Sequence, residues 1–251
     1  MHPDHPTWAQ IPQLRKLWQE AFGDTEAYLD GFFRLGFSAE NCLCIPREGE
    51  MGAALYWLDM TCRGEKIAYI YAVATAGSCR GQGLCRRLME HTHKILQARG
   101  YAMAVLVPQE PGLIRMYASM GYMPGSGIGE QEFTAGGCAS LRRVGAAEYN
   151  VRRNALLPEE SVELGEKALA FLSIHSEFVI GEDFALAAVQ QEGRLVGLEY
   201  LGPPDKAPGI AAALGCTGGT FRVPGNDRYF SMYYPLVPGV AAPAHFGFAF
   251  D

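Results

Sequence analysis

Basic residues are scarce relative to acidic ones in this sequence, and long uncharged apolar runs are missing. The 21 lysines and arginines are outnumbered by 27 aspartates and glutamates, which gives a formal net charge of -6. A general nucleic-acid-binding protein needs a basic surface, so the composition argues against that class and leaves room for cationic partners such as amines. No stretch approaches the roughly 18 apolar residues of a membrane-spanning helix, so we expect no membrane partner.

Signals for export and for metal binding are also missing. The first ten residues, MHPDHPTWAQ, do not combine a basic segment with a following apolar one, as a secretory signal does. The seven cysteines are odd in number and scattered, and Cys42-x-Cys44 lacks the spacing of metal ligands. We therefore expect free thiols, a cytoplasmic location and no metal site.

The length of the chain allows two compact domains. It has 251 residues, of which 49% are hydrophobic, and this is ample for more than one core. The pattern changes near residue 145, which predicts one domain over 1–145 and a second over 146–251. The oligomeric state is left open, and a dimer is compatible with the sequence.

The stretch 70–100 carries the clearest local pattern, a strand followed by a turn and a helix. Residues 70–75 are uncharged and rich in aromatic and β-branched side chains, whereas 76–83 are small, polar and rich in glycine. Apolar residues from Leu84 onward recur on one helical face, and Gly100 is placed to end the helix. A helix that begins directly after such a turn aims free N–H groups and a positive dipole end at it, which favours an anion site, above all for phosphate.

Two common nucleotide-binding patterns do not fit this turn. The Walker loop is excluded because no Gly-Lys-Ser/Thr follows four residues after a glycine, and Arg86 stands where the dinucleotide fingerprint needs its third glycine. Residues 80–85, RGQGLC, do resemble the signature Arg/Gln-x-x-Gly-x-Gly/Ala of the GCN5-related N-acetyltransferases (GNAT). The loop of that family wraps the pyrophosphate of coenzyme A. Cys85 departs from the signature, but it is small enough to permit close approach.

A second segment resembles the same family. Residues 113–122, LIRMYASMGY, are similar to its Tyr-x-x-x-Gly-Phe/Tyr segment, with Tyr117 and Gly121 in place. The order of predicted elements is also that of the GNAT fold, so over roughly residues 8–145 the resemblance implies an α/β fold with a mixed sheet. Those elements are helices over 12–22 and from residue 24 or 25, strands over 41–45, 52–61 and 66–75, the helix from 84, a strand over 102–107, a helix over 111–120, and a strand over 139–144 that closes the sheet.

The resemblance implies an N-acetyltransferase that uses acetyl-coenzyme A (acetyl-CoA) as donor and a primary amine as acceptor, by direct attack on the thioester. In this family the strand backbone runs beside the pantetheine arm, an N–H at its splayed end polarises the thioester carbonyl, and loop amides hold the pyrophosphate. Tyr117 is the implied general acid, since a phenol with a pKa of about 10 stays protonated at pH 7. The implied cofactor-binding residues are Val73, Ala74, Thr75, Arg80, Gly81, Gln82, Gly83, Leu84, Cys85 and Arg86.

A general base is not visible in the sequence. Neither of the strands over 66–75 and 102–107 carries a carboxylate, and Glu110 is equally explained as a first-turn acid. The side chain or terminal carboxylate of Asp251 is a catalytic candidate, because some multidomain relatives feed their C terminus into the active site. The alternative, a strand that only completes a sheet, stays open. Helix caps or solvated faces explain three further carboxylates better, and packing or surface positions explain two histidines: Glu20, Asp24, Glu26, His91 and His93.

The last hundred residues have a pattern of their own. Hairpin, short helix and further strands resemble a degenerate, GNAT-like half, although without the Arg-x-x-Gly-x-Gly/Ala loop this half should not bind coenzyme A in that manner. A lipid-carrier-like or separate α+β lobe remains an alternative. The predicted elements are a helix over 158–173, a hairpin over 184–190 and 195–201, a helix over 207–214, and strands over 220–223, 229–236 and 245–250.

Two other functions compete with the acetyltransferase. One is a catalytically weak coenzyme A-binding regulator, which the missing strand carboxylate favours and the Tyr117 segment disfavours. The other is a protein-interaction module formed by the C-terminal lobe. The sequence leaves the acceptor open between a small-molecule amine and a peptide amine, and it does not fix the length of the acyl chain.

Overall fold

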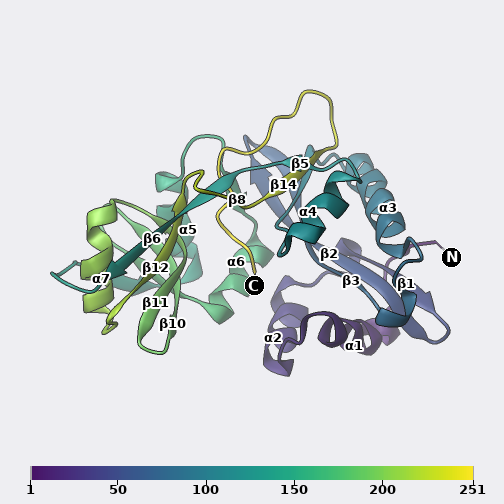
Figure 1. Cartoon of the computed structure of the whole chain (residues 1–251), viewed down its shortest axis with the longest axis horizontal. Helices are drawn as coiled ribbons and strands as arrows, with labels where there is room; N and C mark the ends of the chain where they lie inside the picture. The colour runs from purple at the N-terminus through teal and green to yellow at the C-terminus, as the bar shows by residue number, and fades with distance from the viewer. Residues whose placement is uncertain (1, 251) are drawn as a thin grey trace. The chain divides into compact units, whose positions relative to one another are not determined.

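The computed structural model describes residues 2–250 and divides into two compact units (Figure 1). The chain returns to each unit more than once, so neither is a single continuous segment. The boundary near residue 145 stays a prediction, because a compact unit need not be an independently folding domain. Unit 1 holds the described residues up to Met123, Gly165–Phe171 and Tyr233–Ala241, and unit 2 holds Pro124–Leu164, Leu172–Met232 and the described residues from Ala242 onward.

Unit 1 begins with two helices where the sequence predicts them. Helix α1, Ile11–Phe22, has a proline in its first turn, buries one apolar face that includes Trp18, and ends at Gly23 in the left-handed conformation. Helix α2, Glu26–Gly31, is capped by the Thr25 hydroxyl, which accepts the Tyr28 N–H at 3.2 Å. It continues as a π-helical turn over Phe32–Gly36.

The sheet of unit 1 has the order β1-β2-β3-β4-β14-β5. Strands β1, β2 and β3 pair antiparallel, whereas β3 and β4 are parallel and are joined by helix α3. Helix α4 follows β4 in the chain. The bounds are β1 Cys42–Arg47, β2 Glu50–Cys62, β3 Glu65–Thr75, α3 Leu84–Ala98, β4 Met103–Leu106, α4 Pro111–Ala118, β5 Met123–Pro124 and β14 Met232–Pro235.

Strand β3 bends at a β-bulge. The pairing with β2 shifts between Ala54↔Ala74 and Tyr56↔Tyr71, and Ala72 has a positive φ of 47°. The parallel ladder with β4 ends at Tyr69, just before the bulge. Beyond that point β3 and β4 part, and the edge of β3 that faced β4 is open.

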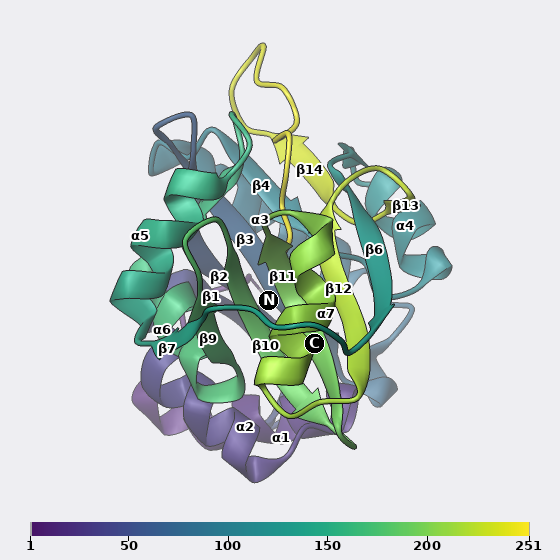
Figure 2. The same cartoon turned by 90° about the vertical axis from the view of Figure 1, so that its left-hand side faces the viewer.

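The sheet of unit 2 has the order β13-β6-β12-β11-β10-β9-β7 (Figure 2). One face packs on helix α7 through a buried apolar cluster that includes Leu186, Ile210 and Phe221. The bounds are β6 Gly127–Thr134, β7 Arg142–Val144, α5 Ala146–Leu156, β8 Val162–Leu164, α6 Glu166–His175, β9 Glu177–Ile180, β10 Ala185–Gln191, β11 Arg194–Leu201, α7 Ala207–Ala213, β12 Gly218–Pro224 and β13 Arg228–Tyr229.

The two halves of the chain repeat one topology. The order α1-α2-β1-β2-β3-α3-β4 returns as α5-α6-β9-β10-β11-α7-β12, with the third strand again parallel to the fourth. The bulge returns as well: Ala187↔Glu199 and Ala188↔Gly197 leave Leu198 of β11 unpaired. A shared order, shared strand directions and a shared bulge agree with the degenerate second half that the sequence suggested.

Three sequence expectations were wrong in detail. The strand near 139–144 does not close the first sheet, because β7 pairs with β9 of the second sheet and β14 lies beside β4 instead. The helix expected from 158 begins only at Glu166, after strand β8. The segment 245–250 forms no strand, although Phe246 and Phe248 in it are fully buried. In each case a local pattern could not identify the distant partner.

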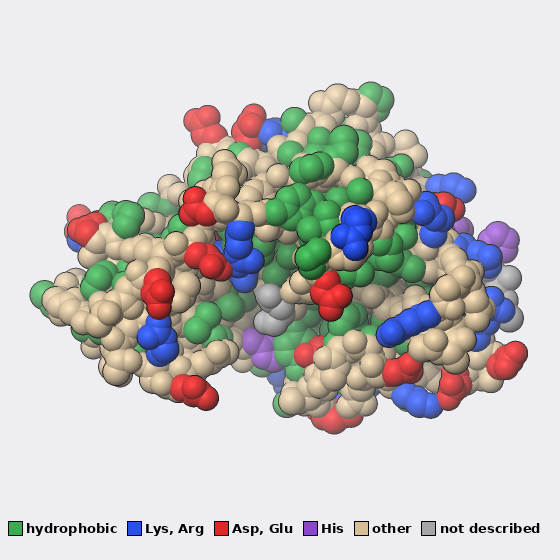
Figure 3. All heavy atoms as spheres, in the orientation of Figure 1, with side chains coloured by type: hydrophobic (Ala, Val, Ile, Leu, Met, Phe, Trp, Pro, Cys, Tyr) green, Lys and Arg blue, Asp and Glu red, His purple; other side chains and the backbone are tan. Residues whose placement is uncertain are grey.

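The surface agrees with the mixed charge of the sequence. On the face shown in Figure 3, lysine and arginine side chains are scattered among acidic ones. Within residues 2–250, no helix combines the length and apolar character needed to cross a membrane. No cluster of three or more His, Cys, Asp or Glu side chains in the same residues is placed to hold a metal ion.

The parallel pairing of β11 and β12 depends on a residue without a side chain. A Cβ on Gly219 would lie 2.0 Å from the carbonyl oxygen of Leu195. We expect Gly219→Ala to lower the free energy of unfolding by about 1–3 kcal/mol, measured by urea denaturation. Gly136→Ala is the control, because its Cβ would meet nothing within 4 Å. Equal stability of the two variants would contradict this reading of the pairing.

Candidate coenzyme A site

The loop between β3 and α3 is held open by two glycines. Gly81 and Gly83 have φ values of +74° and +73°, and a Cβ at either position would meet no atom within 4 Å. Gly83 is the N-cap residue of α3, which begins at Leu84. The backbone of this loop is therefore exposed to a ligand from the side that the glycines leave bare.

The loop also presents free hydrogen-bond donors. The first amide of the helix with a helical partner is that of Arg87, which donates to the Gly83 carbonyl at 3.1 Å. For the amides of residues 81–86, no acceptor lies within hydrogen-bonding distance in the described part of the chain. These N–H groups stand at the positive end of the α3 dipole, so together they fit a pyrophosphate.

Side chains of the loop brace its shape. The Gln82 side-chain amide donates to the Ser78 carbonyl at 3.3 Å, and the Arg80 Nε donates to the Thr75 carbonyl at 3.4 Å. Both side chains are exposed, and the rest of the Arg80 guanidinium remains available beside the loop. Leu84 is buried, so of the predicted residues in this loop it can contribute only its backbone.

The open edge of β3 lies just before this loop. The Ala76 N–H donates to the Gly52 carbonyl of β2 at 2.9 Å. Because backbone groups alternate along a strand, Ala74 also directs its N–H and carbonyl toward β2, whereas those of Val73 and Thr75 point to the open edge. Of the three predicted pantetheine-side residues, Val73 and Thr75 are thus the two whose backbone groups face a ligand there.

Tyr117 lies on α4, near the beginning of α3. It is 6% exposed, and burial followed by the nearby Cys85 raises its pKa, so the phenol keeps its proton at neutral pH. Burial likewise raises the pKa of the Cys85 thiol to about 11. The Arg86 guanidinium donates to the Ser119 carbonyl at 3.2 Å and to its hydroxyl at 2.9 Å, which ties the end of α4 to the start of α3.

A buried histidine supports the Tyr117 segment from behind. Tyr122 meets Tyr117 edge-on, with ring centroids 5.7 Å apart, and its hydroxyl lies 3.0 Å from His93 Nε2. His93 is stacked on Tyr234 at 3.9 Å, and Tyr234 packs over the backbone of Gly121. The sequence indicated a packing role for His93 but could not reveal the contribution of Tyr234, which is distant in the chain.

The carboxylates considered as bases have structural partners. The Glu20 side chain accepts the Gly77 N–H at 2.7 Å, and the Asp24 side chain accepts the indole N–H of Trp18 at 2.7 Å. Glu26 pairs with an arginine and a glutamine of α1. These carboxylates cap and brace the α1–α2 region, and each would have to give up a contact to take a proton.

Two other carboxylates complete the survey. Glu110 is the N-cap residue of α4, where its side chain makes no capping hydrogen bond. Asp251, the other base candidate from the sequence, lies outside the described residues. Its catalytic role stays a prediction.

The described geometry is that of a strand with an open edge, a backbone anion cradle and a phenol nearby, which is the arrangement of an acyl-coenzyme A acyltransferase. Residues 3–125 match the acetyltransferase (GNAT) domain family. Through this domain, the chain belongs to the GNAT acetyltransferases, as its sequence predicted. Acetyl-CoA is the acyl donor in this family.

Solved structures share the fold over most of the chain. A GCN5-related N-acetyltransferase from Kribbella flavida is 18% identical, with a TM-score of 0.72 over 92% of this chain and 70% of that one. Another from Anabaena variabilis is 16% identical, with a TM-score of 0.70 over 94% and 72%. A tandem GNAT protein from the clavulanic acid biosynthesis pathway is 11% identical, with a TM-score of 0.57 over 95% and 99%.

These likenesses establish the fold, a GNAT domain followed by a smaller α+β lobe. At such low identity they carry no substrate from one protein to another. No curated protein matches the sequence significantly.

Protonation of His93 should couple the stability of this region to pH. Burial lowers its pKa from 6.5 to about 4. Between these values the unfolded chain binds a proton that the folded chain does not, so stability falls as pH falls through this window. From about pH 7.5 to about pH 5, the wild type should lose about 2 kcal/mol more than His93→Gln, measured by urea denaturation. Equal losses would show that His93 is not buried as a neutral side chain.

Proposed function

We propose that this protein is an acetyl-CoA-dependent N-acetyltransferase that acts on a primary amine by direct attack on the thioester. The observation that carries the proposal is the set of unpaired loop amides at the start of α3, next to the open edge of β3. Pyrophosphate and pantetheine need such a cradle and such an edge in succession, and acetyl-CoA brings the activated acyl group itself. The acceptor is a small molecule or a peptide that presents an amine.

The backbone of β3 supplies orientation and electrostatic stabilisation. The Val73 and Thr75 backbone groups on the open edge would hold the pantetheine arm as an added strand, and the Val73 N–H would donate to the thioester carbonyl oxygen as negative charge develops there. Since the bulge at Ala72 fixes the direction of this N–H, no reorganisation is needed during the reaction. The loop residues from Arg80 to Arg86 would hold the pyrophosphate.

Tyr117 would serve as general acid. Its raised pKa keeps the proton on the phenol, and its position by Cys85 at the start of α3 supports a place near the departing thiolate. The proton acceptor for the amine is a separate question. Because the described carboxylates of the α1–α2 region are engaged, Asp251 remains a hypothesis for that role, and its deletion tests it through the pH profile of kcat.

A second candidate function is a coenzyme A-binding regulator with weak turnover. The engagement of Glu20 and Asp24 in structural contacts favours it. The two functions differ in one observable: an enzyme releases free thiol from acetyl-CoA when amines are added, whereas a regulator binds coenzyme A without amine-dependent release. A thiol reagent with a panel of small and peptide amines separates them.

Gly83→Asp should weaken coenzyme A binding by about tenfold or more. The substitution adds bulk and negative charge at the helix end that would hold the pyrophosphate. Gly100→Asp is a matched control, because Gly100 has a similar φ of +76° and free space around it but lies at the other end of α3. Calorimetry should show weakened binding only for Gly83→Asp. Unchanged affinity in that variant would refute the placement of the pyrophosphate.

Tyr117→Phe should leave coenzyme A affinity unchanged and lower kcat by about 100-fold or more, since only the proton donor is removed. Tyr229→Phe serves as a control, because Tyr229 is a partly exposed tyrosine on β13 of the other unit. The measurement is steady-state thiol release. Wild-type turnover in Tyr117→Phe would remove this residue from the mechanism.

A further inference from the structure

The second half of the chain keeps the architectural opening that the first half has between β3 and β4. The parallel ladder of β11 and β12 ends at Gly197↔Phe221, and the bulge at Leu198 follows at once. Beyond the ladder, the end of β11 has no pairing with β12. By topology this opening corresponds to the edge where we place the acyl donor in the first half.

The connection after β11 cannot hold a pyrophosphate as the first half does. Pro203, Pro204 and Pro208 lack backbone N–H groups, and the Lys206 N–H already donates to the Pro203 carbonyl at 3.2 Å. Helix α7 has only seven residues. The second half therefore retains the opening without the anion cradle that belongs with it.

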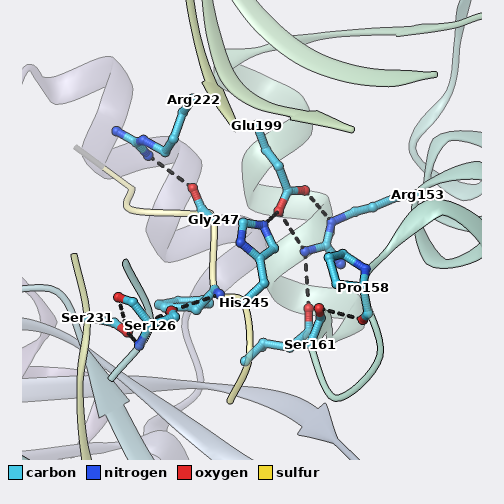
Figure 4. A network of polar contacts seen from close by, with 11 residues as sticks. Ser126, Arg153, Pro158, Ser161, Glu199, Arg222, Ser231, His245 and Gly247 are labelled. Carbon is cyan, nitrogen blue, oxygen red and sulfur yellow. Dashed lines mark hydrogen bonds and ion pairs between the residues drawn. The ribbon is translucent and has the colours of Figure 1, made fainter. Parts of the chain in front are cut away.

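The C-terminal segment of the chain lies in this opening (Figure 4). His245 Nε2 lies 2.9 Å from Oε1 of Glu199, which is two residues past the end of the ladder on β11. The Arg222 guanidinium, one residue past the end of the ladder on β12, donates to the Gly247 carbonyl at 3.2 Å. Both parted strands thus contact the same short stretch of chain.

The backbone of this segment is also paired with its surroundings. The Ala244 N–H donates to the Glu160 carbonyl at 3.0 Å, and the His245 carbonyl accepts the Val162 N–H at 2.9 Å. The next amide, that of Phe246, donates to the Ser126 hydroxyl at 3.0 Å. These contacts are of the kind that bind an extended peptide, yet they do not form a regular strand ladder.

Burial and charge complete the seat. Phe246 and Phe248 are 0% exposed, and the Arg153 guanidinium lies 5.3 Å from the Phe248 ring centroid. Arg153 pairs with Glu199 at 2.6 Å, and both side chains are fully buried. Burial alone would raise the pKa of Glu199, but Arg153 and His245 lower it to about 2, so the acceptor for His245 stays charged.

One position of the segment is restricted to glycine by space. A Cβ on Gly247 would lie 2.4 Å from Glu199 Oε1 and 2.7 Å from His245 Nε2. Any side chain there would push the segment away from the pair that anchors it. The seat therefore discriminates among peptides by sequence as well as by apolar character.

We propose that the second half has kept the substrate groove of the fold as a peptide-binding site, and that its ligand is the chain's own segment 244–250. The segment replaces a pantetheine arm in the opening between β11 and β12. The class of ligand is an extended peptide with a histidine, a glycine two residues later and phenylalanines on either side of that glycine.

The first test measures hydrogen exchange in the full-length protein. Amides of 244–250 should be protected in the wild type to the same degree as β11. In Gly247→Ala they should exchange at least tenfold faster, while β11 and β12 remain protected. The control Gly136→Ala should match the wild type. Wild-type exchange at the rate of an unstructured peptide would overturn the proposal.

The second test adds the ligand from outside. A labelled, amidated peptide of sequence AHFGFAF should bind Gly247→Ala in fluorescence anisotropy, and the wild type, whose groove is filled, should bind it at least tenfold more weakly. The same peptide carrying Gly247→Ala should not bind. Failure of the unaltered peptide to bind a folded variant with a released segment would end the assignment.

A second variant guards against loss of the fold. Arg222→Met removes the guanidinium that donates to the Gly247 carbonyl but keeps an apolar stem over the Phe230 ring. We expect it to remain folded by circular dichroism and to release the segment, with exchange at 246–248 at least tenfold faster than in the wild type. Unchanged exchange in a folded Arg222→Met protein would count against the groove as the seat of the segment.

Discussion

The parting of two parallel strands after a three-residue ladder is the constraint on which this structure depends. In each half a bulge follows the ladder at once, at Ala72 in β3 and at Leu198 in β11. Backbone groups beyond the parting point toward no neighbouring strand, and buried backbone polar groups need partners. The fold therefore creates a demand for a guest chain at this place, and the guest is what differs between the halves.

The first half meets that demand with an exposed loop in which glycines bare the amides, so the guest is a phosphate-bearing molecule that comes and goes. The second half has prolines where those amides would be, and a peptide segment anchored by the buried pair of Arg153 and Glu199. A buried ion pair is poor evidence for stability in itself, but here its remaining acceptor capacity is used by His245. One architecture thus supports an exchangeable guest and a covalently attached one.

The sequence predicted the elements whose signals are local. The strand, turn and helix over 70–100 were confirmed because glycine placement and helical periodicity act within a few residues. Partners distant in the chain were beyond its reach: nothing near β4 indicates that β14 lies beside it, and nothing near His93 indicates Tyr234. The alternating phenylalanines after His245 look like a strand, yet they are buried in a groove without a ladder. Periodicity reports which side chains avoid water, not which backbone pairs with which.

The position of β14 has a consequence for how such a chain can be divided. This strand comes from the last twenty residues of the sequence, yet it covers the edge of β4 in the sheet of the catalytic domain. A fragment that stops near residue 145 would leave that edge bare, and an uncovered edge strand invites pairing between molecules. After a duplication, this arrangement would tie the fate of the second copy to the first. The copy can lose its cofactor and its chemistry, but a gene that loses the copy also loses a strand from the working sheet.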